Sequence, residues 1–68
     1  MKTVTRKHVE KALANYRAKP QCFMLTYHGN PPTTVRCDNL DKANWADVKV
    51  VKVILDDRLY PSFKVKAR

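Results

Sequence analysis

The sequence predicts an α+β fold, in which an N-terminal helix packs on a small antiparallel sheet of about four strands. Three observations predict it. Apolar residues recur at helical spacing before Pro20, two later regions each contain a pair of strand-like segments joined by a turn, and a short helical connection separates these regions. The predicted order is helix, strand, strand, short helix, strand, strand. The chain has 68 residues, and we expect residues 1–68 to form a single small basic domain.

The first predicted element is an amphipathic helix. Its apolar stripe consists of residues at i, i+3, i+4 and i+7, which are Val9, Ala12, Leu13 and Tyr16. Thr3 or Thr5 can cap its start, because a hydroxyl oxygen accepts a hydrogen bond from an N–H of the first turn. Pro20 disfavours helical geometry at the residue before it, so we expect the helix to end near Ala18.

The first predicted hairpin follows this helix. Gln21–His28 is apolar on both faces, which is typical of a strand in the middle of a sheet. Gly29-Asn30-Pro31-Pro32 ends that strand, and Thr33–Asp38 gives a shorter second strand.

The register of this hairpin is predicted from its loop. With His28 facing Thr33, the pairs further along are Met24 with Cys37 and Phe23 with Asp38. This register places Arg36 on the side that carries Phe23, Leu25 and Tyr27.

Residues 38–47 form the predicted connection between the hairpins, and they contain a short helix. Asp38 or Asn39 would cap this helix, and Asp41 suits the positive end of its dipole. Leu40 and Trp45 are the predicted anchors of the connection to the core.

Val48–Lys66 predicts the second hairpin, with its turn at Asp56-Asp57-Arg58. Alternation divides the first strand into one side with Val51, Val53 and Leu55 and another with Val50, Lys52 and Ile54. In the second strand, one side carries Leu59, Pro61, Phe63 and Val65, and the other carries Tyr60, Ser62, Lys64 and Lys66. Pro61 cannot donate a ladder hydrogen bond, so its strand should lie at an edge or be bulged there. The hairpin is therefore predicted to have one apolar face and one basic face.

Charge is the strongest guide to the class of partner. The net charge is +8, which favours nucleic acid, an anionic membrane surface or an acidic protein. Residues 1–37 carry +6, residues 38–57 carry −2 and residues 58–68 carry +4. A surface that only keeps a protein soluble would more often mix the two signs of charge.

The compartment is predicted from what the sequence lacks. Met1–Lys11 has positive charge without the apolar run of a secretory signal, and no stretch approaches about 18 consecutive apolar residues. We therefore expect a cytoplasmic protein without a membrane span. The two cysteines are then expected to be reduced thiols.

Catalytic and metal chemistry has little support in the sequence. The candidate soft ligands His8, Cys22, His28 and Cys37 lack the close spacing of a compact zinc site, although the last three could converge in the first hairpin. A Cys–His catalytic pair would also need an orienting group and a cleft. The single glycine excludes a glycine-rich phosphate loop. We predict no enzyme activity, no metal and no cofactor.

The leading functional prediction is a non-enzymatic binding module for an anionic partner, with nucleic acid favoured over an acidic protein. Lysine and arginine neutralise phosphates, and a tyrosine exposed on a sheet can stack on unpaired bases. The predicted binding residues are Arg36, Lys52, Tyr60, Lys64 and Lys66 on the sheet, with Arg6 and Lys7 on the helix. Tyr27 near Arg36 would extend the stacking surface.

The alternative is a small inhibitor or adaptor that binds an acidic surface of a larger protein. The Phe63–Lys66 edge could add to a partner's sheet, or join two copies of the chain in a homodimer. Compact, cysteine-poor chains of this kind are common among viral accessory proteins, especially those of phages. The likeness concerns only chain length and general composition. A membrane-surface binder is disfavoured, because Trp45 lies in the acidic middle of the chain.

Overall fold

One α-helix, one 3₁₀ helix and four strands make up the fold in this computed structural model, which describes residues 2–16, 19–56, 58–59 and 61–67. The elements in chain order are α1 (Arg6–Tyr16), β1 (Pro20–Tyr27), β2 (Thr33–Cys37), the 3₁₀ helix η1 (Leu40–Lys42), β3 (Val48–Leu55) and β4 (Ser62–Lys66). The predicted α+β class and order of elements are confirmed. The predicted end of the first helix near Ala18 lies outside the described residues.

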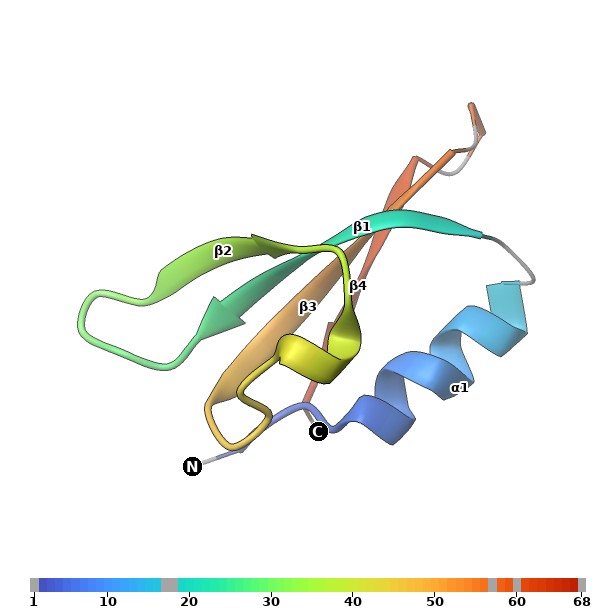
Figure 1. Cartoon of the computed structure of the whole chain (residues 1–68). Helices are drawn as coiled ribbons and strands as arrows, with labels where there is room; N and C mark the ends of the chain where they lie inside the picture. The colour runs from blue at the N-terminus through green and yellow to red at the C-terminus, as the bar shows by residue number, and fades with distance from the viewer. Residues whose placement is uncertain (1, 17–18, 57, 60, 68) are drawn as a thin grey trace.

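The four strands form one antiparallel sheet in the order β2-β1-β3-β4 (Figure 1). β1 and β3 are the central strands. The central position of β1 was predicted from the apolar character of both its faces. β4 is an edge strand, and Pro61 immediately precedes it. The Pro61 carbonyl accepts a hydrogen bond of 2.8 Å from the Leu55 N–H, which closes the β3–β4 ladder at that end.

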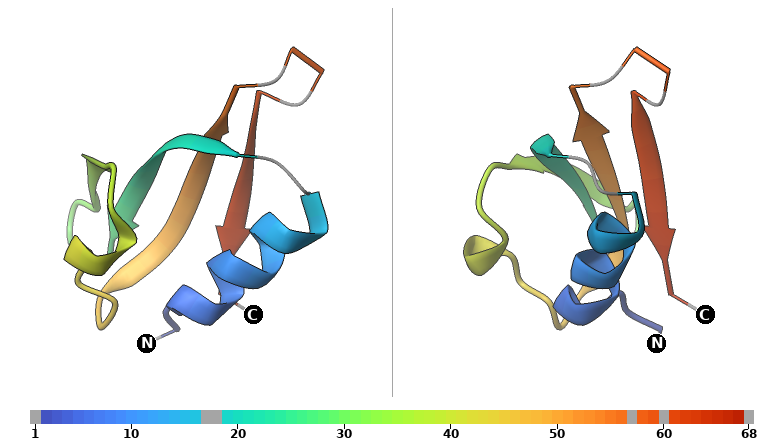
Figure 2. Two further views of the ribbon diagram at one scale, coloured as in Figure 1. Left: turned by 45° about the vertical axis from the view of Figure 1, so that its right-hand side comes forward. Right: turned by 90° about the vertical axis from the view of Figure 1, so that its right-hand side faces the viewer.

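The core lies between α1 and one face of the sheet (Figure 2). Because side chains alternate along a strand, β1 and β3 each contribute every second residue to it. The buried residues are Val4, Val9, Phe23, Leu25, Val48, Val51, Val53 and Leu55. Leu40 and Trp45 pack against this core as predicted, and the Trp45 indole N–H donates to the Leu40 carbonyl at 3.1 Å. η1 therefore lies on the same side of the sheet as α1.

Both ends of α1 are held to the sheet by specific contacts. At the start, Thr5 Oγ1 accepts a hydrogen bond of 3.3 Å from the His8 N–H, so Thr5 is the cap of the two threonines considered. The Val4 N–H just before it donates to the Val48 carbonyl at 2.8 Å. At the end, the Tyr16 ring stacks on Phe63 of β4, with ring centroids 4.2 Å apart and planes 5° from parallel.

The predicted register of the first hairpin is wrong by one residue. Phe23 pairs with Cys37 and Met24 with Arg36, so Arg36 lies on the opposite side of the sheet from Phe23. The reason is that the connection includes His28, which leaves the β1–β2 ladder. Its N–H donates to the Asp47 carbonyl at 2.9 Å, and its Nε2 lies 2.6 Å from the Lys2 carbonyl oxygen.

The connection between β3 and β4 is longer than the predicted three-residue turn. It comprises residues 56 to 61, and its described part lies beyond the ends of β3 and β4 (Figure 1). Leu59 was expected on the apolar side of the last strand, but it lies in this connection and is 84% exposed. That prediction is wrong because the ladder ends at Leu55 and Pro61, before Leu59 could lie over the core. Asp57 and Tyr60 lie outside the described residues.

Candidate functional site

The side of the sheet opposite α1 forms a surface that we call the open face. Directly opposed residues on antiparallel strands point to the same side, so the pairings between strands define its members. One row crosses all four strands as Arg36, Met24, Lys52 and Lys64, and the next as Thr34, Thr26, Val50 and Lys66. A third row consists of Cys22, Ile54 and Ser62.

Four cationic side chains of the open face are solvent-exposed: those of Arg36, Lys52, Lys64 and Lys66. Lys52 and Lys64 are directly opposed on adjacent strands, with Cα atoms expected about 5 Å apart. Lys66 lies two residues further along β4, about 7 Å from Lys64. Arg36 lies two strands from Lys52, at a distance of about 10 Å.

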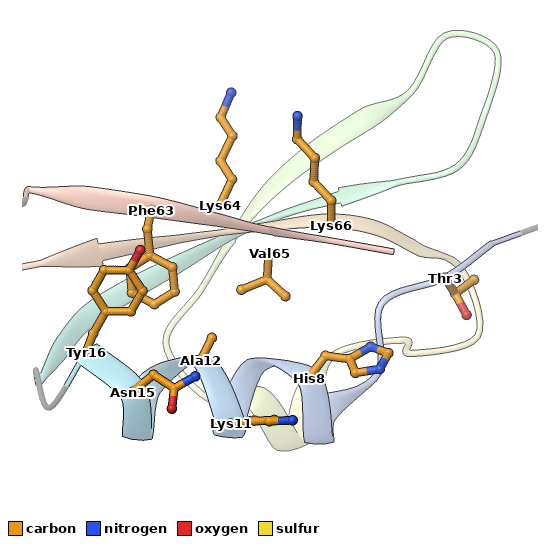
Figure 3. A pocket seen from close by; sticks show the side chains of 10 residues that line it. All are labelled: Thr3, His8, Lys11, Ala12, Asn15, Tyr16, Phe63, Lys64, Val65 and Lys66. Carbon is orange, nitrogen blue, oxygen red and sulfur yellow. The ribbon is translucent and has the colours of Figure 1, made fainter. Parts of the chain in front are cut away.

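Alternation along β4 separates its lysines from its apolar residues. Figure 3 shows Lys64 and Lys66 pointing away from α1, whereas Phe63 and Val65 point toward it. The predicted assignment of these residues to two faces is therefore correct. The same holds for β3, where Val51, Val53 and Leu55 are buried while Lys52 is exposed on the other side.

The charge of Arg36 is partly offset by a nearby carboxylate. Its Nε lies 3.3 Å from Asp38 Oδ1, and the two side chains are 69% and 72% exposed. A pair this exposed contributes only about 0–1 kcal/mol, because water and salt screen it. An incoming anion can therefore compete with Asp38 for the guanidinium group.

Arg6 and Lys7 are not brought together with the strand cations. Both lie on α1, on the covered side of the sheet. Arg6 pairs with Glu10 at 3.2 Å and also with Asp41, so it connects α1 to η1. The hydrogen bond to Asp41 is the main cause that raises the pKa of the Arg6 guanidinium above its ordinary value. The predicted set thus divides into a sheet group and a helix group, while Tyr60 lies outside the described residues.

Aromatic residues within the described ranges lie away from the open face. The expected stacking position of Tyr27 beside Arg36 is wrong, because Tyr27 pairs with Thr33 and Val48 on the covered side. Its hydroxyl accepts a hydrogen bond of 3.2 Å from the Asn44 N–H. The open face instead carries half-buried Met24 between Arg36 and Lys52. Sequence reasoning missed that position because it depends on the β1–β2 register.

The thiols and His28 do not converge. Cys22 pairs with Ile54 on the open face, whereas Cys37 pairs with Phe23 on the covered face. The Cys37 thiol donates to the Asn39 carbonyl at 2.9 Å. In the parts of the chain that the structure describes, no three or more His, Cys, Asp or Glu side chains form a cluster that could hold a metal ion.

Comparisons with protein-family models, with curated proteins and with solved structures find no match to this chain. Across residues 2–16, 19–56, 58–59 and 61–67, no helix has both the length and the apolar character that crossing a membrane requires. The open face is therefore the surface from which a function can be inferred.

Proposed function

We propose that this chain is a non-enzymatic module that binds nucleic acid through its phosphates. The binding surface is the open face, and the contacting residues are Arg36, Lys52, Lys64 and Lys66. The observation that carries the proposal is the direct opposition of Lys52 and Lys64 across β3 and β4.

Like charges that face each other directly across two strands destabilise a sheet. An anion between the two ammonium groups would remove that repulsion, so the pair favours a bound phosphate over an empty surface. Lys66 continues the positive charge along β4, and Arg36 continues it across the sheet. Each phosphate that these groups neutralise releases condensed counterions, which supplies affinity independent of base sequence.

The proposed binding has little base preference. The hydroxyls of Thr26 and Thr34 lie 3.0 Å apart and form a hydrogen bond with each other. Among the other neighbours of the cations, Met24, Val50 and Ile54 are apolar, and Ser62 adds a single hydroxyl. None of these groups offers the paired donors and acceptors that distinguish base edges.

The proposal is tested by fluorescence anisotropy with a labelled duplex and a labelled single strand of mixed sequence. With four phosphate contacts, the affinity for duplex should fall roughly 150-fold as NaCl rises from about 50 to about 200 mM. Single strands should show a loss of roughly 50-fold over the same range. Absence of binding to either probe at the lower salt concentration would contradict the proposal.

A second candidate function is binding to an acidic surface of a larger protein, as an inhibitor or adaptor. The observation that favours it is the mixture of cations with Met24, Val50 and Ile54 on one face, since protein interfaces combine apolar centres with polar rims. In that case nucleic acid would bind feebly, and a pull-down after nuclease treatment would still recover one stoichiometric protein. We place either activity in the cytoplasm, where Cys22 and Cys37 would remain reduced.

A further inference from the structure

A groove of about 640 Å³ lies between α1 and the edge strand β4, and it shares Lys64 and Lys66 with the open face (Figure 3). Its apolar lining comes from Ala12 and Tyr16 on α1 and from Phe63 and Val65 on β4. This volume is within the range of about 300–1,000 Å³ that is typical of ligand sites.

The edge of β4 supplies the groove with backbone groups. In an antiparallel ladder, hydrogen-bonded and non-bonded pairs alternate. Because the Leu55 N–H bonds to Pro61, the main chains of Phe63 and Val65 face β3, and those of Ser62, Lys64 and Lys66 face outward. Lys64 and Lys66 line the groove although their side chains point away from α1 (Figure 3). Their outward-facing main chains therefore border the groove.

The charge of the lining indicates what the groove would accept. Lys11 stands on the helix side, and Lys64 and Lys66 stand on the strand side. The lining residues include no Asp or Glu. An acidic segment therefore complements the groove, whereas a basic one would be repelled.

We infer that the groove binds an acidic peptide segment, which adds to β4 as a fifth strand. Residues of that segment opposite Phe63 and Val65 would point toward α1 and should be apolar. Residues opposite Lys64 and Lys66 would point to the other side and should be Asp or Glu. The partner is thus an extended peptide in which acidic and apolar residues alternate.

A second copy of this chain fits the same edge poorly. Pairing two β4 strands would place the lysines of one copy beside those of the other, and like charges across strands are destabilising. Lysines on an edge strand are a common protection against such self-association. The same lysines that reject a second β4 attract an acidic strand.

The test uses the full chain and fluorescein-labelled peptides of seven residues. One alternates Val and Glu with Glu at its centre (the Glu–Val peptide), a second has Lys in place of each Glu (the Lys–Val peptide), and a third has Pro in place of the central Glu, whose N–H would bond to β4. The Glu–Val peptide should bind, the Lys–Val peptide should not, and Pro should weaken binding roughly tenfold or more because it cannot pair along the strand. Equal affinity for all three peptides, or no binding of the Glu–Val peptide, would overturn the inference.

Charge reversal on α1 separates this site from the proposed nucleic-acid site. Lys11→Glu adds a negative charge to the groove lining and should weaken the acidic Glu–Val peptide up to about fivefold through repulsion, while duplex affinity stays near that of wild type. Lys7→Glu makes the same charge change outside the groove lining and is the control. If Lys11→Glu and Lys7→Glu lose equal affinity for the Glu–Val peptide, the groove is not the peptide site. This conclusion holds whether or not the duplex affinity changes.

Amide hydrogen exchange locates the added strand. The N–H groups of Ser62, Lys64 and Lys66 should become protected when the Glu–Val peptide binds. Protection at Thr34 and Arg36 instead would assign the peptide to the β2 edge and overturn the inference. A mass of twice the chain in sedimentation, lost on adding peptide, would identify a second copy as the natural occupant and would also overturn it.

Discussion

Lys52 on β3 stands directly opposite Lys64 on β4, and both side chains lie on the side of the sheet that α1 leaves uncovered. Two ammonium groups in this position repel each other, and the free chain carries this repulsion. The proposed function explains the arrangement, because a phosphate bound between the two ammonium groups would neutralise both of them.

Lys52→Glu should therefore make the free chain more stable while it weakens binding. The new carboxylate faces Lys64, and an opposite-charge pair across two strands contributes about 0.2–1 kcal/mol. Urea unfolding measures the gain, with Lys49→Glu as a control of equal charge change that does not face Lys64. A loss of stability specific to Lys52→Glu would argue against the opposed pair.

The double variant Lys64→Glu, Lys66→Glu should lose nucleic-acid binding without loss of fold. Removing two phosphate contacts weakens duplex binding roughly 60-fold at about 100 mM salt, and the added negative charge weakens it further. Circular dichroism should be unchanged, because both side chains are exposed. The control is Lys7→Glu, Lys11→Glu, which changes the net charge equally on α1, on the covered side. If the control loses as much affinity, binding depends on net charge and not on the open face.

Asp38→Asn should strengthen nucleic-acid binding. Asp38 lies 3.3 Å from the Arg36 guanidinium, and its removal frees that cation for a phosphate. The expected gain is up to about fivefold at low salt, given the modest energy of an exposed pair. Anisotropy with the same duplex measures it. A loss of affinity on this substitution would mean that Asp38 holds Arg36 in its binding position.

Phe63→Ala should destabilise the fold, since Phe63 joins β4 to α1 through its stack on Tyr16. Phe63 is half-buried, so we expect about 2–3 kcal/mol, below the 3–5 kcal/mol typical of fully buried phenylalanine. A double-mutant cycle with Tyr16→Ala should give a coupling of about 0.5–1.5 kcal/mol. Additive effects of the two substitutions would show that the rings do not stack in solution.

Local patterns were sufficient to predict the two faces of β3 and β4. Phe63, Lys64, Val65 and Lys66 alternate with period 2, and this alternation alone assigned them to opposite sides of the sheet. The stripe on α1 and the cap at Thr5 are equally local. Such features depend on residues close together in the chain, so the sequence contains the information directly.

The features that were missed depend on distant contacts. His28 leaves the β1–β2 ladder because its N–H donates to the Asp47 carbonyl. The register therefore differs by one residue from the predicted one, and Arg36 lies on the open face beside Met24. Arg6 is paired with Asp41, which is 35 positions later in the chain. The exposure of Leu59 follows from where the β3–β4 ladder ends. No periodicity in the sequence specifies the His28–Asp47 contact, the Arg6–Asp41 pair or the position where the β3–β4 ladder ends.

The most direct test of the proposed function is the salt dependence of duplex binding by Lys52→Ala. If Lys52 contacts one phosphate, the slope of log K against log salt should change by about 0.9, from about −3.6 to about −2.7. An unchanged slope would show that Lys52 touches no phosphate, and it would contradict the assignment of the open face as the nucleic-acid surface.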